Sequence, residues 1–180
     1  QGELPVPKPR SYPRVKYPKR NYQAMGPDFC HFNFEFPDYA LIEQKDLFFD
    51  DTPADPCWFD LYLPNFDGRI HFSYYPIESL ADWEKKRDQA FEMATYHTKR
   101  ASRIEEMRID KSPELGGMIF DIDGPAASPY QFFLTDSTSH FVRAALYFNT
   151  QARPDSLRPI IDYVVTDIDR LIETFEWKNE

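Results

Sequence analysis

A stretch of mostly apolar residues in the middle of the chain predicts a buried hairpin. Residues 130–134 and 141–149 are largely aromatic, aliphatic or small, which is typical of strands that are buried on both faces. The residues between them, 135–140, are polar, and Gly124 and Pro129 precede the first strand. We therefore predict two central antiparallel strands that are joined by a polar turn.

Alternation of apolar and polar residues predicts further strands. Residues 30–36 place their phenylalanines on one side and polar residues on the other, which is typical of a half-buried strand. A turn at residues 65–68 is expected to join strands 57–63 and 69–75 into a second hairpin. The remaining strands are expected at residues 39–43, 107–109 and 117–123.

A long helix is predicted with Ser79 as its N-cap. Apolar and small residues recur at spacings of three and four up to Ile104, which corresponds to one face of a helix of about seven turns. His97 lies on that face between Ala94 and Ala101. Two interpretations of His97 stay open, namely a core histidine with hydrogen-bond partners and a ligand-binding residue.

A second helix is predicted after an N-cap at Asp155 or Ser156, because apolar residues from position 157 to position 175 form a wide stripe. The charged residues off this stripe are expected to face solvent: Asp162, Asp167, Asp169, Arg170 and Glu173. Together the elements predict an α+β fold, in which an antiparallel sheet of about six strands is flanked by two long helices.

The first 20 residues contain five prolines and predict an extended tail, because proline fixes φ and removes backbone donors. We assign residues 1–25 to a Pro-rich basic tether and residues 26–180 to a single α+β domain. The tether carries a net charge of +5, whereas the whole chain of 180 residues carries −9. Such a tail either folds back on the acidic body or reaches an anionic surface. The acidic body argues against a nucleic acid partner, because phosphate binding needs clustered Lys and Arg.

The chain has two cysteines, Cys30 and Cys57. In an oxidising compartment they would close a loop of 26 residues, and the bridge would stabilise the fold by about 3 kcal/mol. Two buried free thiols are the alternative. The cysteine spacing does not fit a zinc finger, and the sequence has no apolar run long enough to cross a membrane.

The polar turn contains residue types that serve in catalysis and in recognition. Asp136, Ser137 and His140 have the chemistry of an acid, a nucleophile and a base, but they lie in one turn, whereas catalytic triads combine separate elements. Since the sequence also lacks a GxSxG motif, we expect no enzyme, and a hydrolase is the third hypothesis. The turn residues either bond the backbone or belong to a periplasmic module that binds a small molecule or a peptide, which is the second hypothesis. The candidate binding residues are His97, Gln131, Asp136, Ser137, His140 and Arg143.

Two acidic pairs raise the question of a calcium site: Asp50 with Asp51, and Asp121 with Asp123. Neither pair follows the spacing of an EF-hand loop, and the second is more typical of a strand that enters a turn. The chain has six glycines and no Gly-rich phosphate loop. We therefore predict neither a metal site nor a cofactor.

Four blocks of sequence resemble the gliding motility lipoprotein GldD family. They are PCWFDLYLPNFDGRIHFSY (56–74), YHTKRA (96–101), AASPYQFFLTDSTSHFVRAALYFN (126–149) and LIETFEWK (171–178). The resemblance extends from about residue 9 to residue 178 and so covers nearly the whole chain.

The resemblance implies a non-catalytic protein of the gliding motility and type IX secretion machinery, which contacts other envelope proteins. It also implies a lipid anchor, on a cysteine that precedes residue 1, at the periplasmic side of the outer membrane. In that compartment Cys30 and Cys57 are expected to pair. The order of elements is similar to the Mog1/PsbP-like α/β/α sandwich, which is a comparison of folds alone.

Overall fold

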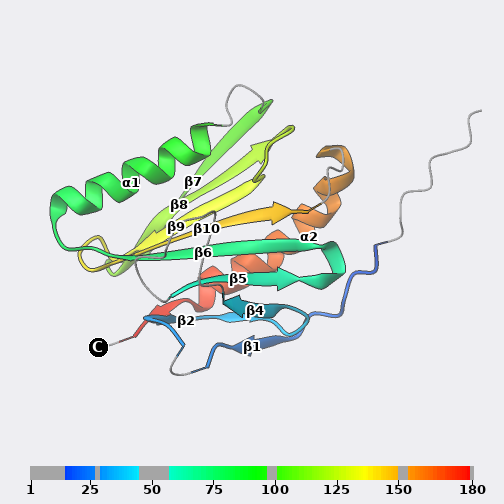
Figure 1. The fold of residues 1–180 in the computed structure, drawn as a ribbon, viewed down its shortest axis with the longest axis horizontal. Helices are drawn as coiled ribbons and strands as arrows, with labels where there is room; N and C mark the ends of the chain where they lie inside the picture. Colours follow the sequence, from blue (N-terminus) through cyan, green and yellow to red (C-terminus); the bar gives the residue numbers. More distant parts are fainter. Residues whose placement is uncertain (1–14, 27–28, 45–56, 97–100, 150–153, 179–180) are drawn as a thin grey trace, which may run out of the picture.

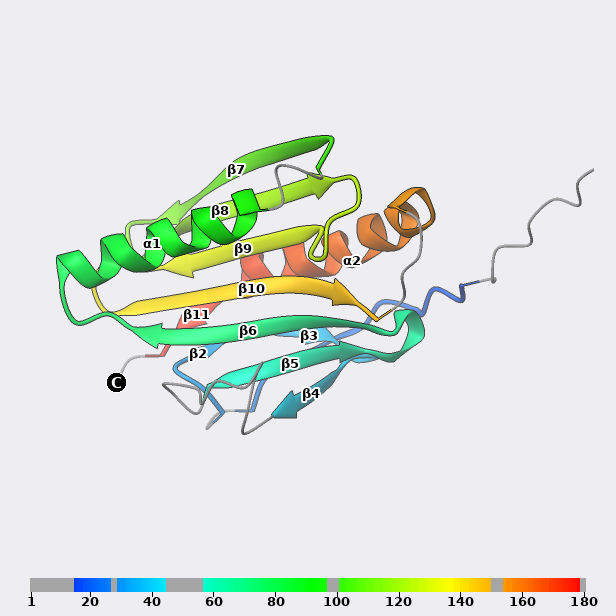
Figure 2. The same ribbon diagram turned by 45° about the horizontal axis from the view of Figure 1, so that its top comes forward.

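The structure is a computed structural model that describes residues 15–26, 29–44, 57–96, 101–149 and 154–178. Its main sheet contains β4 (Leu41–Gln44), β5 (Trp58–Leu63), β6 (Gly68–Pro76), β7 (Arg103–Ser112), β8 (Leu115–Asp123), β9 (Tyr130–Thr135) and β10 (His140–Phe148). These seven strands are antiparallel in the order β4-β5-β6-β10-β9-β8-β7. Figure 2 shows β7 at one edge of this sheet and β4 at the other.

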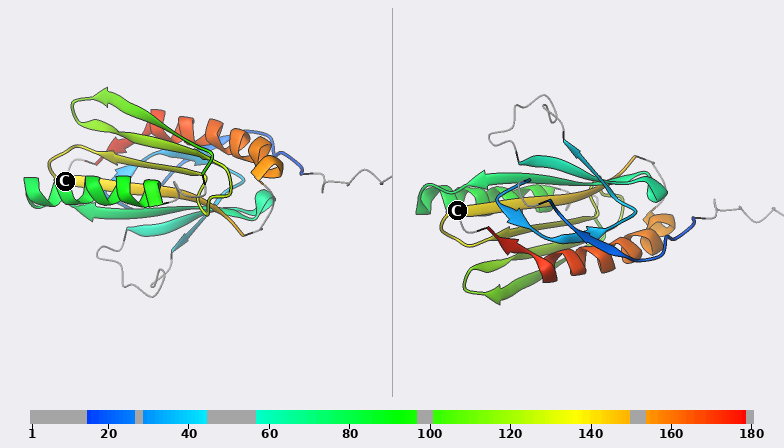
Figure 3. Two further views of the ribbon diagram at one scale, coloured as in Figure 1. Left: turned by 90° about the horizontal axis from the view of Figure 1, so that it is seen from above. Right: turned by 90° about the horizontal axis from the view of Figure 1, so that it is seen from below.

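Two helices, α1 (Leu80–Thr95) and α2 (Pro154–Thr174), cover opposite faces of the sheet. Neighbouring residues of β9 demonstrate this, because Phe132 belongs to the core beneath α2 whereas Phe133 belongs to the core beneath α1. Figures 1 and 3 show the sheet between the two helices. We call the two sides the α1 face and the α2 face. The predicted α/β/α sandwich is confirmed, with seven strands in the sheet.

The central hairpin is confirmed as the middle of the sheet. All six residues of β9 are buried, and β10 pairs with β9 on one side and with β6 on the other. The second predicted hairpin, β5 with β6, is also present, and its turn is formed by η1 (Pro64–Phe66) and by Asp67, whose φ of 48° is left-handed.

The α2 face carries the larger core, which is rich in stacked aromatic rings. The ring centroids of Phe59 and Phe72 lie 4.7 Å apart, and those of Phe34 and Phe72 lie 5.4 Å apart. From α2, Val164 and Ile168 are buried against this group. Burial of this aromatic area is the main source of stability that the fold contains.

Two small sheets and a disulfide close this core. β1 (Tyr22–Ala24) pairs with β3 (Glu35–Pro37), and β11 (Glu176–Trp177) pairs with β2 (Phe32–Asn33). The expected disulfide between Cys30 and Cys57 is present, with the two Cα atoms 5.5 Å apart. It connects the segment before β2 to the start of β5.

Helix α1 is shorter than predicted. Its N-cap is confirmed, since Ser79 Oγ accepts a hydrogen bond of 3.1 Å from the backbone N–H of Asp82. The prediction that the helix continues to Ile104 is wrong, because α1 ends at Thr95 and Ile104 lies in β7. Ile104 packs in the core beneath α1 as a strand residue. Its position in the sequence matched the helical spacing of apolar residues by coincidence. Neither described helix has the length and hydropathy of a membrane span.

The N-terminal segment lies against the domain from residue 15 onward. Strand β1 falls within the predicted tether, and Tyr17 packs on Phe66 and Tyr163 with ring centroids 5.8 and 4.9 Å away. Of the two alternatives for the basic tail, residues 15–25 therefore adopt the folded-back one. Residues 1–14 lie outside the described residues.

Candidate functional site

The polar turn between β9 and β10 is held by its own hydrogen bonds. Asp136 Oδ1 accepts from the backbone N–H groups of Thr138, Ser139 and His140 at 3.0, 2.8 and 2.9 Å. Thr135 Oγ1 accepts from the N–H of residue 137 at 2.9 Å and donates to the carbonyl of residue 140 at 2.6 Å. Burial by itself would raise the pKa of Asp136, but the three N–H groups lower it overall. These contacts are typical of a turn in which side chains fix the backbone.

His140 points to the α2 face, where it belongs to an aromatic stack. Its Nδ1 lies 2.5 Å from the hydroxyl of Tyr74, and its ring stacks on Trp177 with a centroid distance of 4.9 Å. His31 in turn stacks on Tyr74 at 4.3 Å. Since Trp177 lies in β11, this stack fastens the C-terminal strand to the main sheet.

Gln131 and Arg143 point to the opposite, α1 face. Arg143 Nη2 donates a hydrogen bond of 2.6 Å to Gln131 Oε1, and Gln131 is buried. The predicted binding residues are therefore divided between the two faces, with His140 on one side and Gln131 and Arg143 on the other, while Asp136 and Ser137 lie in the turn at the end of the hairpin. His97 lies outside the described residues.

The prediction that Asp167 faces solvent is wrong. The residue is only 3% exposed, and its carboxylate accepts hydrogen bonds from Arg20 Nε at 3.2 Å and from the hydroxyls of Tyr22 and Tyr39 at 2.7 Å each. Burial, followed by the hydrogen bond to Asp167, raises the pKa of Tyr22 to about 12, and the same causes raise the pKa of Tyr39. Helical periodicity placed Asp167 off the apolar stripe but cannot reveal that the N-terminal segment covers that side of α2.

The cavity beside Asp167 is too small for an organic ligand. Its walls include Tyr39, Leu63 and Ile168, and it encloses about 10 Å³, which corresponds to at most one water molecule. This gap is a feature of the core and not a binding pocket.

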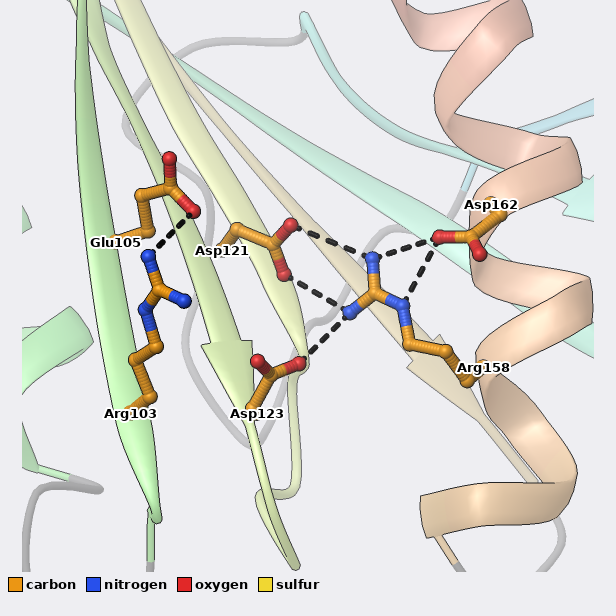
Figure 4. Close-up of polar contacts among 6 residues, drawn as sticks. All are labelled: Arg103, Glu105, Asp121, Asp123, Arg158 and Asp162. Carbon is orange, nitrogen blue, oxygen red and sulfur yellow. Dashed lines mark hydrogen bonds and ion pairs between the residues drawn. The ribbon is translucent and has the colours of Figure 1, made fainter.

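The second acidic pair binds an arginine. Asp121, Asp123 and Asp162 surround the Arg158 guanidinium at 3.1, 2.9 and 2.8 Å (Figure 4). Strand β8 ends at Asp123, and Gly124 follows with φ of 104°, as expected for a strand that enters a turn. In the described part of the chain, no group of three or more His, Cys, Asp or Glu residues is arranged to hold a metal ion.

In a comparison with known families, residues 2–177 match the family described as gliding motility lipoprotein GldD. The chain belongs to the GldD family. As a member of this lipoprotein family it is a lipid-anchored protein of the cell envelope. No curated protein sequence matches the chain.

Among solved structures, this GldD family member is similar to cyanobacterial PsbP (CyanoP) from Synechocystis sp. PCC 6803. The TM-score is 0.53, the sequence identity is 10%, and the match covers 89% of this chain and 95% of that chain. At this identity the likeness shows the fold alone, and it confirms the predicted PsbP-like architecture.

The GldD chain also has polar residues on the α1 face that our sequence analysis missed. His71 Nδ1 lies 2.7 Å from Asp60 Oδ1, and both residues are buried, as is Ser73. They alternate with the apolar residues of β5 and β6 that line the α2 face. This alternation was visible in the sequence. Polar residues on the second face of a strand indicate that this face is not part of an apolar core.

Proposed function

We propose that this GldD family member is a non-catalytic lipoprotein that acts by contacting other proteins of the gliding motility and type IX secretion machinery. We place it on the periplasmic side of the outer membrane. The observation that carries the proposal is the family match over residues 2–177.

The hydrogen bonds of the polar turn support a non-catalytic role. A serine nucleophile needs its hydroxyl within hydrogen-bond reach of an imidazole or another base. Here the ring of His140 is engaged with the Tyr74 hydroxyl and with Trp177, and Asp136 is engaged with three backbone N–H groups. The residue types that suggested a hydrolase thus have structural partners.

The disulfide supports a periplasmic location. Cys57 is buried, and the bridge to Cys30 joins two segments that are far apart in the sequence. Such bridges persist in oxidising compartments and are rare where thiols are kept reduced. A protease added to intact cells should leave the protein uncut, and permeabilising the outer membrane should make it accessible. Cleavage in intact cells would contradict the periplasmic location.

The partner contacts are tested by replacing the gene, in a gliding bacterium that carries it, with a version tagged at the C-terminus. After crosslinking of intact cells, we expect motility and secretion to be retained and a partner protein to be recovered at near-stoichiometric yield. Recovery of intact tagged protein without a stoichiometric partner, in cells that still glide, would contradict the proposal.

A further inference from the structure

Arg143 on the α1 face differs from most other arginines that the structure describes. Arg20, Arg158 and Arg170 each form an ion pair with an Asp or a Glu. In the described part of the chain, no carboxylate lies within ion-pair distance of Arg143 on β10 or of Lys86 on α1. Several of the described lysines and the exposed Arg108 also lack a carboxylate partner among the described residues, but Arg143 is half-buried, so its charge needs an explanation.

These two cations flank an aromatic wall. Lys86 Nζ lies 4.3 Å from the centroid of the Tyr75 ring, and Trp58 packs against the same ring at 5.4 Å. Arg143 is directly opposite Ser73 in the pairing of β10 with β6, and Tyr75 lies two residues further along β6 on the same face. Helix α1 contacts β9 and β10, the strand that carries Arg143, and Figure 2 shows it running along this face of the sheet.

The guanidinium of Arg143 has neutral partners and no carboxylate among the described residues. It has five N–H donors, and its side-chain hydrogen-bond partners, Gln131 and Tyr147, are both neutral. Burial lowers the pKa of Arg143, and interactions with Tyr147 and Tyr75 oppose this only in part. Since arginine nevertheless stays charged in proteins, the half-buried cation is stabilised most by an anion that pairs with it.

We propose that Arg143 and Lys86, with Tyr75 between them, form a binding site for a carboxylate group. A planar carboxylate matches the two parallel N–H groups of a guanidinium. A monoanion fits better than a phosphate dianion, because the carboxylate of Asp60 lies on the same face and the whole chain is acidic. The carboxylate belongs to an acidic side chain of a partner protein. This part of the inference, the origin of the carboxylate, rests on the proposed function.

Carboxylate binding is tested with the purified protein. We would follow the Nε–Hε resonance of Arg143 by NMR during titration with sodium acetate, sodium phosphate and sodium chloride at equal ionic strength. The origin of the carboxylate in a protein side chain is tested with the peptides Ac-Ala-Glu-Ala-NH2 and Ac-Ala-Gln-Ala-NH2. We expect saturable shifts with acetate and with the Glu peptide, a tighter response to the Glu peptide, and no saturable shift with the Gln peptide or with chloride.

Three variants assign the site, and in each of them binding is followed by the backbone amide resonance of Tyr75, which all of them keep. Arg143→Gln should weaken acetate binding by at least about 10-fold, as expected when a charge-assisted hydrogen bond is lost, and Lys86→Gln should weaken it by about 3-fold. Arg108→Gln is the matched control, because Arg108 is an exposed arginine of β7 and its removal should change nothing.

Several results would overturn the site: an Arg143 resonance that does not move at high acetate, tighter binding of phosphate than of acetate, or an unchanged affinity in Arg143→Gln. The first of these uses the unaltered protein, so it remains decisive even if a variant fails to fold. Saturable binding of acetate together with no response to the Glu peptide would overturn a protein partner as the source. Carboxylate binding without a partner in the crosslinking experiment would contradict the proposed function and leave the site standing.

Discussion

The two faces of the sheet are built for different purposes. The α2 face is apolar and aromatic from β5 to β9, and it is closed by α2, by two small sheets and by the Cys30–Cys57 disulfide. The α1 face is apolar mainly beneath α1, and elsewhere it carries Asp60, His71 and Arg143. The difference indicates that the α2 face supplies most of the stability, and we propose that the α1 face serves recognition.

The two helices follow the same division. Helix α2 buries large side chains such as Ile168 and Leu171, and even its one buried acid, Asp167, has three hydrogen-bond donors. Helix α1 buries two alanines fully and exposes Leu80 and Met93. Because alanine buries little area, α1 is held less strongly than α2.

The largest expected effect comes from the aromatic core of the α2 face. Phe72→Ala should lower the free energy of unfolding by about 3–5 kcal/mol, because Phe72 is fully buried between Phe34 and Phe59. Phe91→Ala is the counterpart beneath α1, and it should cost about 1–2 kcal/mol because Phe91 is only half-buried. Urea unfolding measures both values. Equal losses would contradict the assignment of stability to the α2 face.

The second effect concerns the attachment of the N-terminal segment. Asp167→Ala should cost about 3 kcal/mol, since it leaves Arg20, Tyr22 and Tyr39 without their shared acceptor. Asp162→Ala on the same helix is the control and should cost less than about 1 kcal/mol, because that ion pair with Arg158 is exposed. A loss in Asp167→Ala no larger than in Asp162→Ala would show that the segment is not held through this carboxylate.

The third effect tests the backbone that both faces share. In Gly117→Ala the new Cβ would lie 1.9 Å from the carbonyl oxygen of Phe133, so β8 and β9 must move apart, at a cost of about 1–3 kcal/mol. In Gly116→Ala the nearest atom is 3.4 Å away, which is an ordinary contact. Thermal unfolding of the two variants compares them directly, and the close packing of β8 on β9 would be refuted if they melted together.

The smallest effect is pH-dependent and lies in the turn. Asp136→Ala should cost about 1 kcal/mol at pH 7 through loss of hydrogen bonds to the backbone. The folded protein lowers the pKa of Asp136, so this stabilisation is complete above the unfolded pKa of about 3.9 and is lost as the pH falls through the lower folded pKa. The variant and the unaltered protein should therefore converge in stability as the pH falls below about 3.9 and through the lower folded pKa of Asp136. A difference that stays constant from pH 7 to pH 3 would contradict this origin, and Asp136→Asn, which keeps an acceptor oxygen, should lose less.

Local patterns in the sequence predicted the parts of the fold that depend on local chemistry. The run 130–149 predicted the central hairpin because its strands are buried on both faces, and Ser79 predicted the start of α1 because a hydroxyl before an amphipathic stretch caps a helix. The end of α1 could not be predicted, because Ile104 packs in the core beneath α1 as a residue of strand β7 and not as a residue of the helix.

The candidate site was harder to predict, for a geometric reason. His140 and Arg143 are three residues apart and thus point to opposite faces of β10, so closeness in sequence suggested a cluster that the pleat of the strand separates. Lys86 lies on a different element, and its approach to Tyr75 depends on how α1 packs. Asp167 likewise depends on the course of the N-terminal segment.

The central claim, that the α1 face serves recognition and the α2 face serves stability, is tested most directly by motility. In a gliding bacterium that carries the gene, two strains are made. In one the gene encodes both Arg143→Gln and Lys86→Gln, and in the other it encodes Asp136→Ala alone. We predict that the double variant is present at normal levels and fails to restore gliding, whereas Asp136→Ala restores it in spite of its lower stability. Full gliding with the double variant at normal levels would contradict the account.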